Sequence, residues 1–147
     1  MKFIKLAIIS FVAFFILLYL MSLLIPSHVR ISRAINIQTT ARELRPLVSD
    51  TATWGRWMTL NTDSIETSIL GVSDSLVQTR WNYKGRTIAS SFRLEESAGV
   101  TALQWYFDFE LKWYPWEKFG SITFDKQFGG PMETSLNNLK KLIENSP

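Results

Sequence analysis

Twenty consecutive uncharged residues, Leu6 to Ile25, open the pattern of hydrophobic and polar positions along the chain. Only two serines and one tyrosine interrupt the apolar side chains of this run. Because an α-helix rises about 1.5 Å per residue, the run spans roughly 30 Å, the thickness of the hydrocarbon core of a bilayer. The pattern therefore predicts a transmembrane helix whose partner is the lipid bilayer.

A cleaved secretory signal and a buried core helix are two other interpretations of this run. The apolar core of a signal is usually about 7 to 15 residues long and ends at small residues. Here the run is longer and closes with Ser22-Leu23-Leu24-Ile25-Pro26, which contains no small-x-small cleavage site. We therefore expect residues 1–25 to be an uncleaved anchor and residues 26–147 to form one globular domain.

Charges near the run do not decide on which side of the membrane the domain lies. Lys and Arg are enriched on the cytoplasmic side of a span. Lys2 and Lys5 precede the run and favour export of the domain. The opposite orientation is favoured by the arginines that follow the run, which are Arg30, Arg33, Arg42 and Arg45. We expect a single-pass protein of the cell (inner) membrane, with its sidedness left open.

Alternation of apolar and polar residues predicts a half-buried strand from Val29 to Gln38, because successive residues of a strand point to opposite faces. Arg33 falls on the apolar face and needs a partner or a place near the rim. Thr40 and Glu43 then form a capping box, in which each side chain bonds the backbone N–H of the other residue. This box predicts a short helix that Pro46 should kink or shorten.

The segment from Ile65 to Leu111 is typical of an antiparallel meander. Turns are expected at Gly71–Asp74, at Lys84–Gly85 and at Glu95–Gly99. Between the turns, one face of each strand is mostly apolar. The positions on that face are Ile65, Thr67 and Ile69, then Val77, Thr79, Trp81 and Tyr83, then Ile88, Ser90, Phe92 and Leu94, and finally Leu103, Trp105, Phe107, Phe109 and Leu111.

The period changes to that of a helix at the C-terminal end. Met132, Leu136, Leu139 and Ile143 recur at helical spacing and predict an amphipathic helix. Gly129-Gly130-Pro131 is expected to separate this helix from an earlier helical section within residues 115–128. The predicted fold class is α+β, a curved antiparallel sheet that grips a long C-terminal helix and follows one transmembrane helix.

Composition excludes several kinds of chemistry. The chain has no cysteine and one histidine, His28, so a thiolate nucleophile, a disulfide framework and a catalytic triad are not expected. Beyond the two lysines of the anchor, 14 basic residues stand against 13 acidic ones without a basic stripe, which argues against nucleic-acid binding. Asp108 and Glu110 share a strand face, but it is the polar and solvated one. We predict no catalytic residue, no metal site and no cofactor.

Several short motifs are spread along residues 26–147. They are Ile31-Ser-Arg33-Ala-Ile35-Asn-Ile37, Asp50 through Trp54-x-x-Trp57, Tyr114-Pro-Trp-Glu-Lys-Phe119, Asp125-Lys126 with Gly129, and Leu136-Asn-Asn-Leu139-Lys140 with Glu144. These motifs resemble those of the START-like helix-grip superfamily, also called SRPBCC or polyketide cyclase/dehydrase and lipid transport. The likeness covers essentially the whole of residues 26–147 and favours membrane-anchored bacterial members with one N-terminal span.

The resemblance implies a ligand cavity between the sheet and the terminal helix, lined by apolar side chains. The leading hypothesis is a domain that binds a hydrophobic small molecule or lipid there, with no assigned catalysis. Few residues separate Trp57 from Ile65, so the cavity is expected to be smaller or more open than is usual in the superfamily. The candidate ligand-binding residues are Trp81, Tyr83, Phe92, Trp105, Phe107, Phe109, Met132 and Leu136.

Three alternatives to ligand binding stay open. The aromatic side chains can simply fill a core. An enzyme of cyclase or dehydratase type would need polar groups inside the cavity, for which Arg33, Ser90 and Thr79 are the inward-facing candidates. A membrane-tethered interaction domain with a filled core would use an exposed apolar patch around Trp113–Trp116, which also suits a membrane interface. The sequence names no protein partner.

Overall fold

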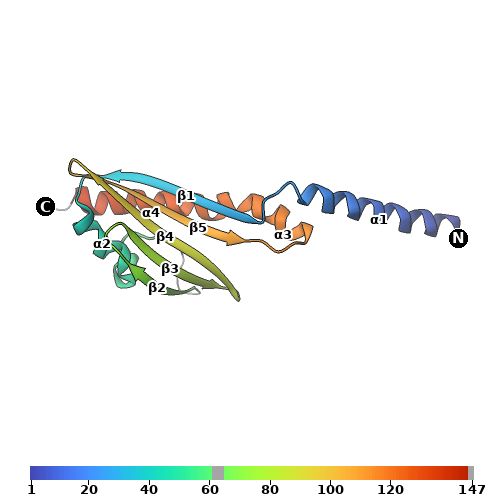
Figure 1. Cartoon of the computed structure of the whole chain (residues 1–147), viewed down its shortest axis with the longest axis horizontal. Coiled ribbons are helices and arrows are strands. Elements are labelled where there is room, and N and C mark those ends of the chain that lie inside the picture. Colours follow the sequence, from blue (N-terminus) through green and yellow to red (C-terminus); the bar gives the residue numbers. More distant parts are fainter. Residues whose placement is uncertain (61–64, 146–147) are drawn as a thin grey trace.

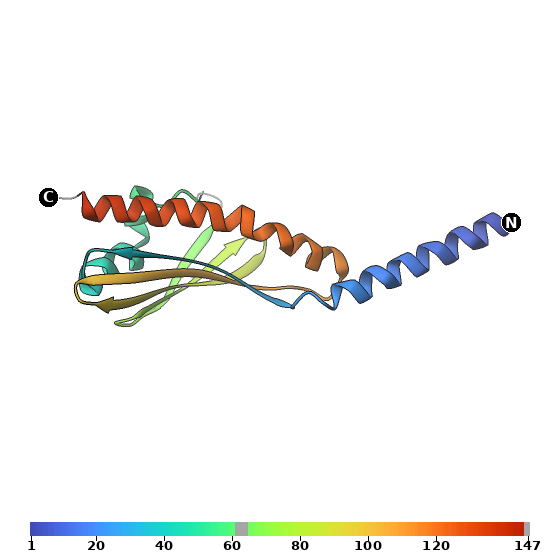
Figure 2. The same ribbon diagram turned by 90° about the horizontal axis from the view of Figure 1, so that it is seen from above.

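The computed structural model describes residues 1–60 and 65–145 of the chain. Five strands form one antiparallel sheet in the order β1-β5-β4-β3-β2. The C-terminal helix lies along one face of this sheet, and the N-terminal helix projects from one end of the domain (Figures 1 and 2). The elements are α1 (Lys2–Ser22), β1 (His28–Ile37), α2 (Ala41–Ser49), η1 (Thr51–Arg56), β2 (Glu66–Val72), β3 (Leu76–Tyr83), β4 (Arg86–Ser97), β5 (Val100–Glu110), α3 (Pro115–Gly120), η2 (Ser121–Thr123), η3 (Asp125–Gly129) and α4 (Gly130–Glu144). The predicted α+β fold class is confirmed.

Helix α1 is long and apolar enough to cross a membrane. It begins at Lys2 and ends at Ser22, so the last three residues of the apolar run, 23–25, lie beyond the helix. Pro26 limits the helix here, because it has no N–H to donate to the Ser22 carbonyl four residues earlier and disfavours helical backbone at Ile25. The link to β1 is short, and the Ser27 carbonyl accepts a 2.7 Å hydrogen bond from the Leu111 amide just after β5.

Strand β1 and helix α2 follow the sequence pattern closely. The Thr40 side chain accepts the Glu43 amide at the start of α2, as one half of the predicted capping box requires. The other half is wrong, because the Glu43 carboxylate accepts a 2.7 Å hydrogen bond from the Thr39 hydroxyl instead. Pro46 lies inside the helix, which continues for three residues beyond it and ends at Ser49, so the expected shortening is not seen.

The meander is confirmed, with two turns tighter than expected. Strand β2 runs on to Val72, and β4 runs on to Ser97. Two of the three hairpin turns, Lys84–Gly85 and Ala98–Gly99, have two residues each, and all four residues have φ between 49° and 80°. Two successive residues of positive φ make a turn whose twist matches that of the strands, which is why glycine occupies the second position of each.

The helical segment after β5 is continuous, and the expected break at Gly129-Gly130-Pro131 is wrong. Helix α3, the 3-10 turn η2, the π-helical turn η3 and α4 follow one another from Pro115 to Glu144. Gly129 lies close to the Arg33 side chain, and a Cβ there would lie 2.9 Å from the guanidinium carbon, so the end of the arginine would have to shift. Arg33 has the partner that its place on the apolar face required, since it bonds Asp125 of η3 at 2.9 Å.

Candidate functional site

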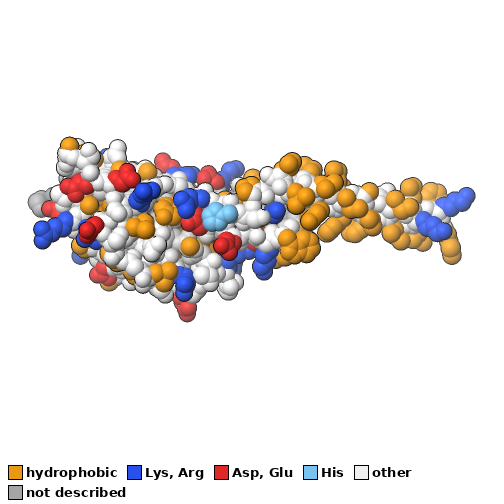
Figure 3. All heavy atoms as spheres, viewed as in Figure 1, with side chains coloured by type: hydrophobic (Ala, Val, Ile, Leu, Met, Phe, Trp, Pro, Cys, Tyr) orange, Lys and Arg blue, Asp and Glu red, His pale blue; other side chains and the backbone are white. Residues whose placement is uncertain are grey.

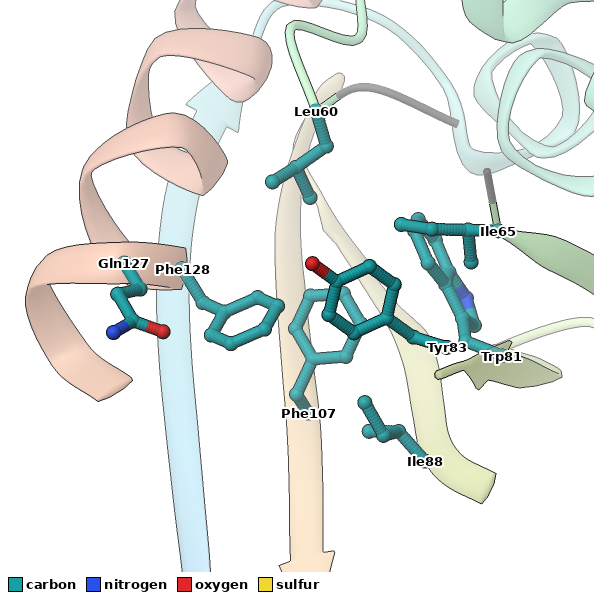
Figure 4. A pocket seen from close by; sticks show the side chains of 8 residues that line it. All are labelled: Leu60, Ile65, Trp81, Tyr83, Ile88, Phe107, Gln127 and Phe128. Carbon is teal, nitrogen blue, oxygen red and sulfur yellow. The ribbon is translucent and has the colours of Figure 1, made fainter. Parts of the chain in front are cut away.

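A hollow lies between the inner face of the sheet and the helical segment around η3. Its volume is about 290 Å³, and it is open to solvent on one side. Figure 4 shows Phe128 reaching from the helix towards Phe107 of β5, with Tyr83 between Leu60 and Ile88. The residues that line this first hollow are Leu60, Ile65, Trp81, Tyr83, Ile88, Phe107, Gln127 and Phe128.

A second hollow of about 290 Å³ adjoins the first near the β3–β4 hairpin. The two share four lining residues, namely Tyr83, Ile88, Gln127 and Phe128. The second is completed by Lys84, Arg86, Phe109 and Phe124. Together they form one apolar depression whose basic side chains come from the hairpin that joins β3 to β4.

Local structure explains why aromatic rings surround this depression. Side chains two residues apart in a strand share a face, so Phe107 and Phe109 of β5 both point inward. Phe124 and Phe128 are four residues apart and project from the same side of the helical segment. The Phe109 ring lies 4.8 Å from the Phe124 ring and 5.1 Å from the Phe128 ring, and Phe107 lies 5.6 Å from Phe128.

The other half of the sheet face is filled. Trp54 and Trp57, at the end of the η1 segment, fold over it and are almost fully buried. Trp54 stacks on Trp81 at 5.5 Å, while Trp57 lies 6.1 Å from both Phe92 and Trp105. This packing leaves a hollow only over the half of the face that lies nearest the β3–β4 hairpin.

The structure divides the eight predicted ligand-binding residues between these two halves. Trp81, Tyr83 and Phe107 line the first hollow, and Tyr83 and Phe109 line the second. The remaining four are fully buried in the closed half, and they are Phe92, Trp105, Met132 and Leu136. Whether any of the eight binds a ligand stays a prediction.

Sequence reasoning missed several of the lining residues. Ile88 lies on the inward face that alternation predicted, but it was not counted as a site residue. Phe124 and Phe128 stand four residues apart, which is a helical signal within a segment whose structure was uncertain. No periodic signal marks Leu60, because it lies in an irregular connection after η1.

The three polar candidates for catalysis are not brought together. The Ser90 hydroxyl accepts the indole N–H of Trp105 at 2.8 Å, and the Thr79 hydroxyl accepts that of Trp81 at 2.9 Å. Both hydroxyls are buried and therefore satisfy tryptophan donors inside the core. Arg33 instead pairs with Asp125 on the helical segment. None of the three lines either hollow.

A further depression of about 400 Å³ lies on the outer face of the sheet, with His28, Asp108 and Glu110 among its lining residues. Arg30 bonds Asp108 at 2.6 Å, and this hydrogen bond raises the pKa of the Arg30 guanidinium above its ordinary value. Charged pairs of this kind are typical of a solvated sheet face rather than an apolar binding site. Within residues 1–60 and 65–145, no cluster of three acidic or histidine side chains could hold a metal.

No protein-family model matches the chain, and no curated protein matches it in sequence. Solved structures do match. CalU16 from Micromonospora echinospora is 15% identical, with a TM-score of 0.60 over 82% of this chain and 84% of CalU16. Protein MLL2253 from Mesorhizobium loti is 11% identical, with a TM-score of 0.63 over 81% of this chain and 99% of that protein.

The di-domain ARO/CYC protein BexL, from the BE-7585A biosynthetic pathway, is a third solved structure that matches this chain. It is 12% identical, with a TM-score of 0.60 over 81% of this chain and 48% of BexL, so this chain spans about half the length of BexL. At such identities the likeness shows the fold alone. The chain has a helix-grip fold.

Proposed function

We propose that this protein is a membrane-anchored helix-grip domain that binds one small, largely apolar molecule in the joined hollows. The observation that carries the proposal is the hollow over the half of the aromatic sheet face nearest the β3–β4 hairpin, which Trp81, Phe107 and Phe128 line. Ligand sites are typically apolar depressions with a few polar groups, and this one lies at the lower end of their size range. The apolar helix α1 supports the membrane anchor.

The lining suggests what kind of molecule fits. Apolar side chains form the floor and walls, while Tyr83, Lys84 and Gln127 supply the polar groups. The charge of Arg86 is compensated by an ion pair with Glu117 of α3. A single acyl chain or a small ring system with one polar head suits this distribution, and a phospholipid with two acyl chains is too large.

An activity of the ARO/CYC type is a second candidate, favoured by the likeness to BexL. General acid or base catalysis would have to use the polar side chains that line the hollows, since Ser90 and Thr79 are hydrogen-bonded within the core. Tyr83 is the lining residue best suited to donate a proton to a bound carbonyl. We rank this function second because the lining residues that the structure describes offer no paired acid and base.

Native mass spectrometry of the purified full chain tests the proposal. After delipidation, added apolar molecules are expected to bind with a stoichiometry of one per chain and to be released with unchanged mass. Release of a product that has lost one water would favour the cyclase or dehydratase alternative. Failure of every acyl and ring compound to rebind, with the fold intact, would refute the proposed binding function.

The charge of Lys84 at the rim of the second hollow leads to a second testable prediction. Lys84 lines the second hollow and lies 5.1 Å from the centre of the Tyr83 ring. Because an exposed charge pair contributes up to about 1 kcal/mol, Lys84→Gln should weaken binding of decanoate roughly two- to fivefold. Binding of decanol, which has no charge, should stay constant. The matched control is Lys126→Gln, an exposed lysine that lines neither hollow, and equal effects of the two variants on decanoate would contradict this role for Lys84.

A further inference from the structure

An aromatic segment of the domain lies against the end of helix α1. The ring of Trp113 is 6.4 Å from Tyr19, and the ring of Trp116 is 6.5 Å from Phe15. Both tryptophans are nevertheless exposed, with 70% and 62% of their surface accessible, and Ile122 is 66% exposed. We call residues Trp113–Ile122, which include α3, the aromatic foot.

Exposed apolar surface is concentrated at this foot. Among the described residues after α1 and its link, the large hydrophobic side chains that are exposed are Leu70, Val72, Trp113, Trp116 and Ile122. Three of the five therefore belong to the foot. Figure 3 shows hydrophobic side chains continuing from α1 onto the adjoining end of the domain, so the foot and the helix form one apolar surface.

The depth of the foot follows from the rise of the helix. Tyr19 lies 17 residues after Lys2, or about 26 Å along α1, which is close to the thickness of a hydrocarbon core. Trp113 beside Tyr19 is then level with the membrane interface, where tryptophan and tyrosine are enriched. Trp116 beside Phe15 lies one turn, about 6 Å, deeper, a typical depth for the apolar face of an interfacial helix.

We propose that the aromatic foot is embedded in the interfacial layer of the bilayer, beside the end of the span. This inference rests on the proposed function in one respect, the membrane anchor. The exposed Lys112 next to the foot, 5.8 Å from the ring of Tyr114, provides a charge for lipid phosphates. Phe124 of the second hollow lies two residues beyond Ile122, so the ligand site begins where the foot ends.

The distribution of tryptophans makes the foot directly measurable. Helix α1 contains none, and four of the six tryptophans, at positions 54, 57, 81 and 105, are almost fully buried in the domain. Quenching of tryptophan emission by lipids therefore reports on Trp113 and Trp116. The full chain is reconstituted in phosphatidylcholine vesicles, with the lipid brominated either high on the acyl chain or near its end.

Bromine high on the acyl chain is expected to quench the emission more than bromine near the chain end. The double variant Trp113→Phe/Trp116→Phe keeps an apolar foot and should lose this quenched fraction. Equal emission in brominated and ordinary vesicles would overturn the proposal. Quenching by acrylamide in the water would then place the two tryptophans in solvent, and protection from acrylamide would indicate that a second copy of the chain covers them.

The anchor is measured separately by washing the same vesicles at alkaline pH. Retention of the protein without lipid quenching would overturn the foot and leave the anchor intact. Release of the protein into the wash would refute the anchor and the foot together. Rebinding of apolar molecules in native mass spectrometry reports on the hollows in either case, so failure of the foot and failure of the ligand site are distinguishable.

Discussion

Replacing Ile88 by tryptophan is expected to weaken binding of an apolar ligand at least tenfold, a loss of about 1.4 kcal/mol or more. Ile88 is almost fully buried and lines both hollows from the floor. A larger ring at this position projects into the space that the ligand would occupy. Overpacking typically costs about 1 to 3 kcal/mol of stability, which a domain of ordinary stability tolerates.

Native mass spectrometry with decanoate measures this loss, and thermal unfolding shows that the domain remains folded. The conservative control Ile88→Val should keep the affinity within about a factor of three, because it removes one methylene group. Gln127→Trp provides an independent test, since Gln127 is an exposed residue that lines both hollows from the helix. Unchanged affinity in both tryptophan variants would show that the ligand binds elsewhere.

Trp105→Ala is expected to lower the free energy of unfolding by about 3 to 5 kcal/mol. Trp105 is fully buried in the closed half of the sheet face, and its ring lies 5.0 Å from Phe92 and 5.3 Å from Phe107. Truncation leaves a large cavity and removes the donor to the Ser90 hydroxyl. Because small domains are stable by roughly 5 to 15 kcal/mol, much of the stability would be lost.

Urea unfolding of the variant and the parent protein measures the change. Ser90→Ala leaves the Trp105 indole N–H without its acceptor and should cost about 1 to 3 kcal/mol. Trp113→Ala removes an exposed ring and should change the stability by at most about 0.5 kcal/mol. If Trp105→Ala weakened ligand binding and left unfolding unchanged, Trp105 would belong to a ligand wall and the closed half would not be a core.

The strands of the sheet and the direction of their side chains could largely be predicted, because one face of the sheet packs against the core and the other faces solvent. Along β5, Trp105, Phe107 and Phe109 alternate with polar residues, and a shift of one residue would turn the whole apolar set outward. Burial therefore determines the register, and alternation reveals it. The Thr40 cap was visible for a similar reason, since its hydrogen bond joins residues three positions apart.

The shape of the site could not be predicted, because it depends on contacts between distant residues. Trp54 and Trp57 cover one half of the aromatic face, but their short 3-10 segment carries no periodic signal that shows where it packs. Gly129 resembled a helix break, and only the position of Arg33 on β1 shows that a larger residue there would displace the Arg33 guanidinium. Local sequence therefore indicated which side chains point inward without indicating which of them line a hollow.

The short link between α1 and β1 limits how far the domain can move relative to α1. Five residues, Leu23 to Ser27, separate the helix from the strand, and even fully extended they reach only about 17 Å. The hydrogen bond between Ser27 and Leu111 and the packing of Trp113 on Tyr19 shorten this reach further. A domain on a long flexible tether can search the surrounding volume for its ligand. With the proposed membrane anchor, this domain would have little freedom to move, so encounters with the proposed ligand would depend on molecules that diffuse to the foot of the domain.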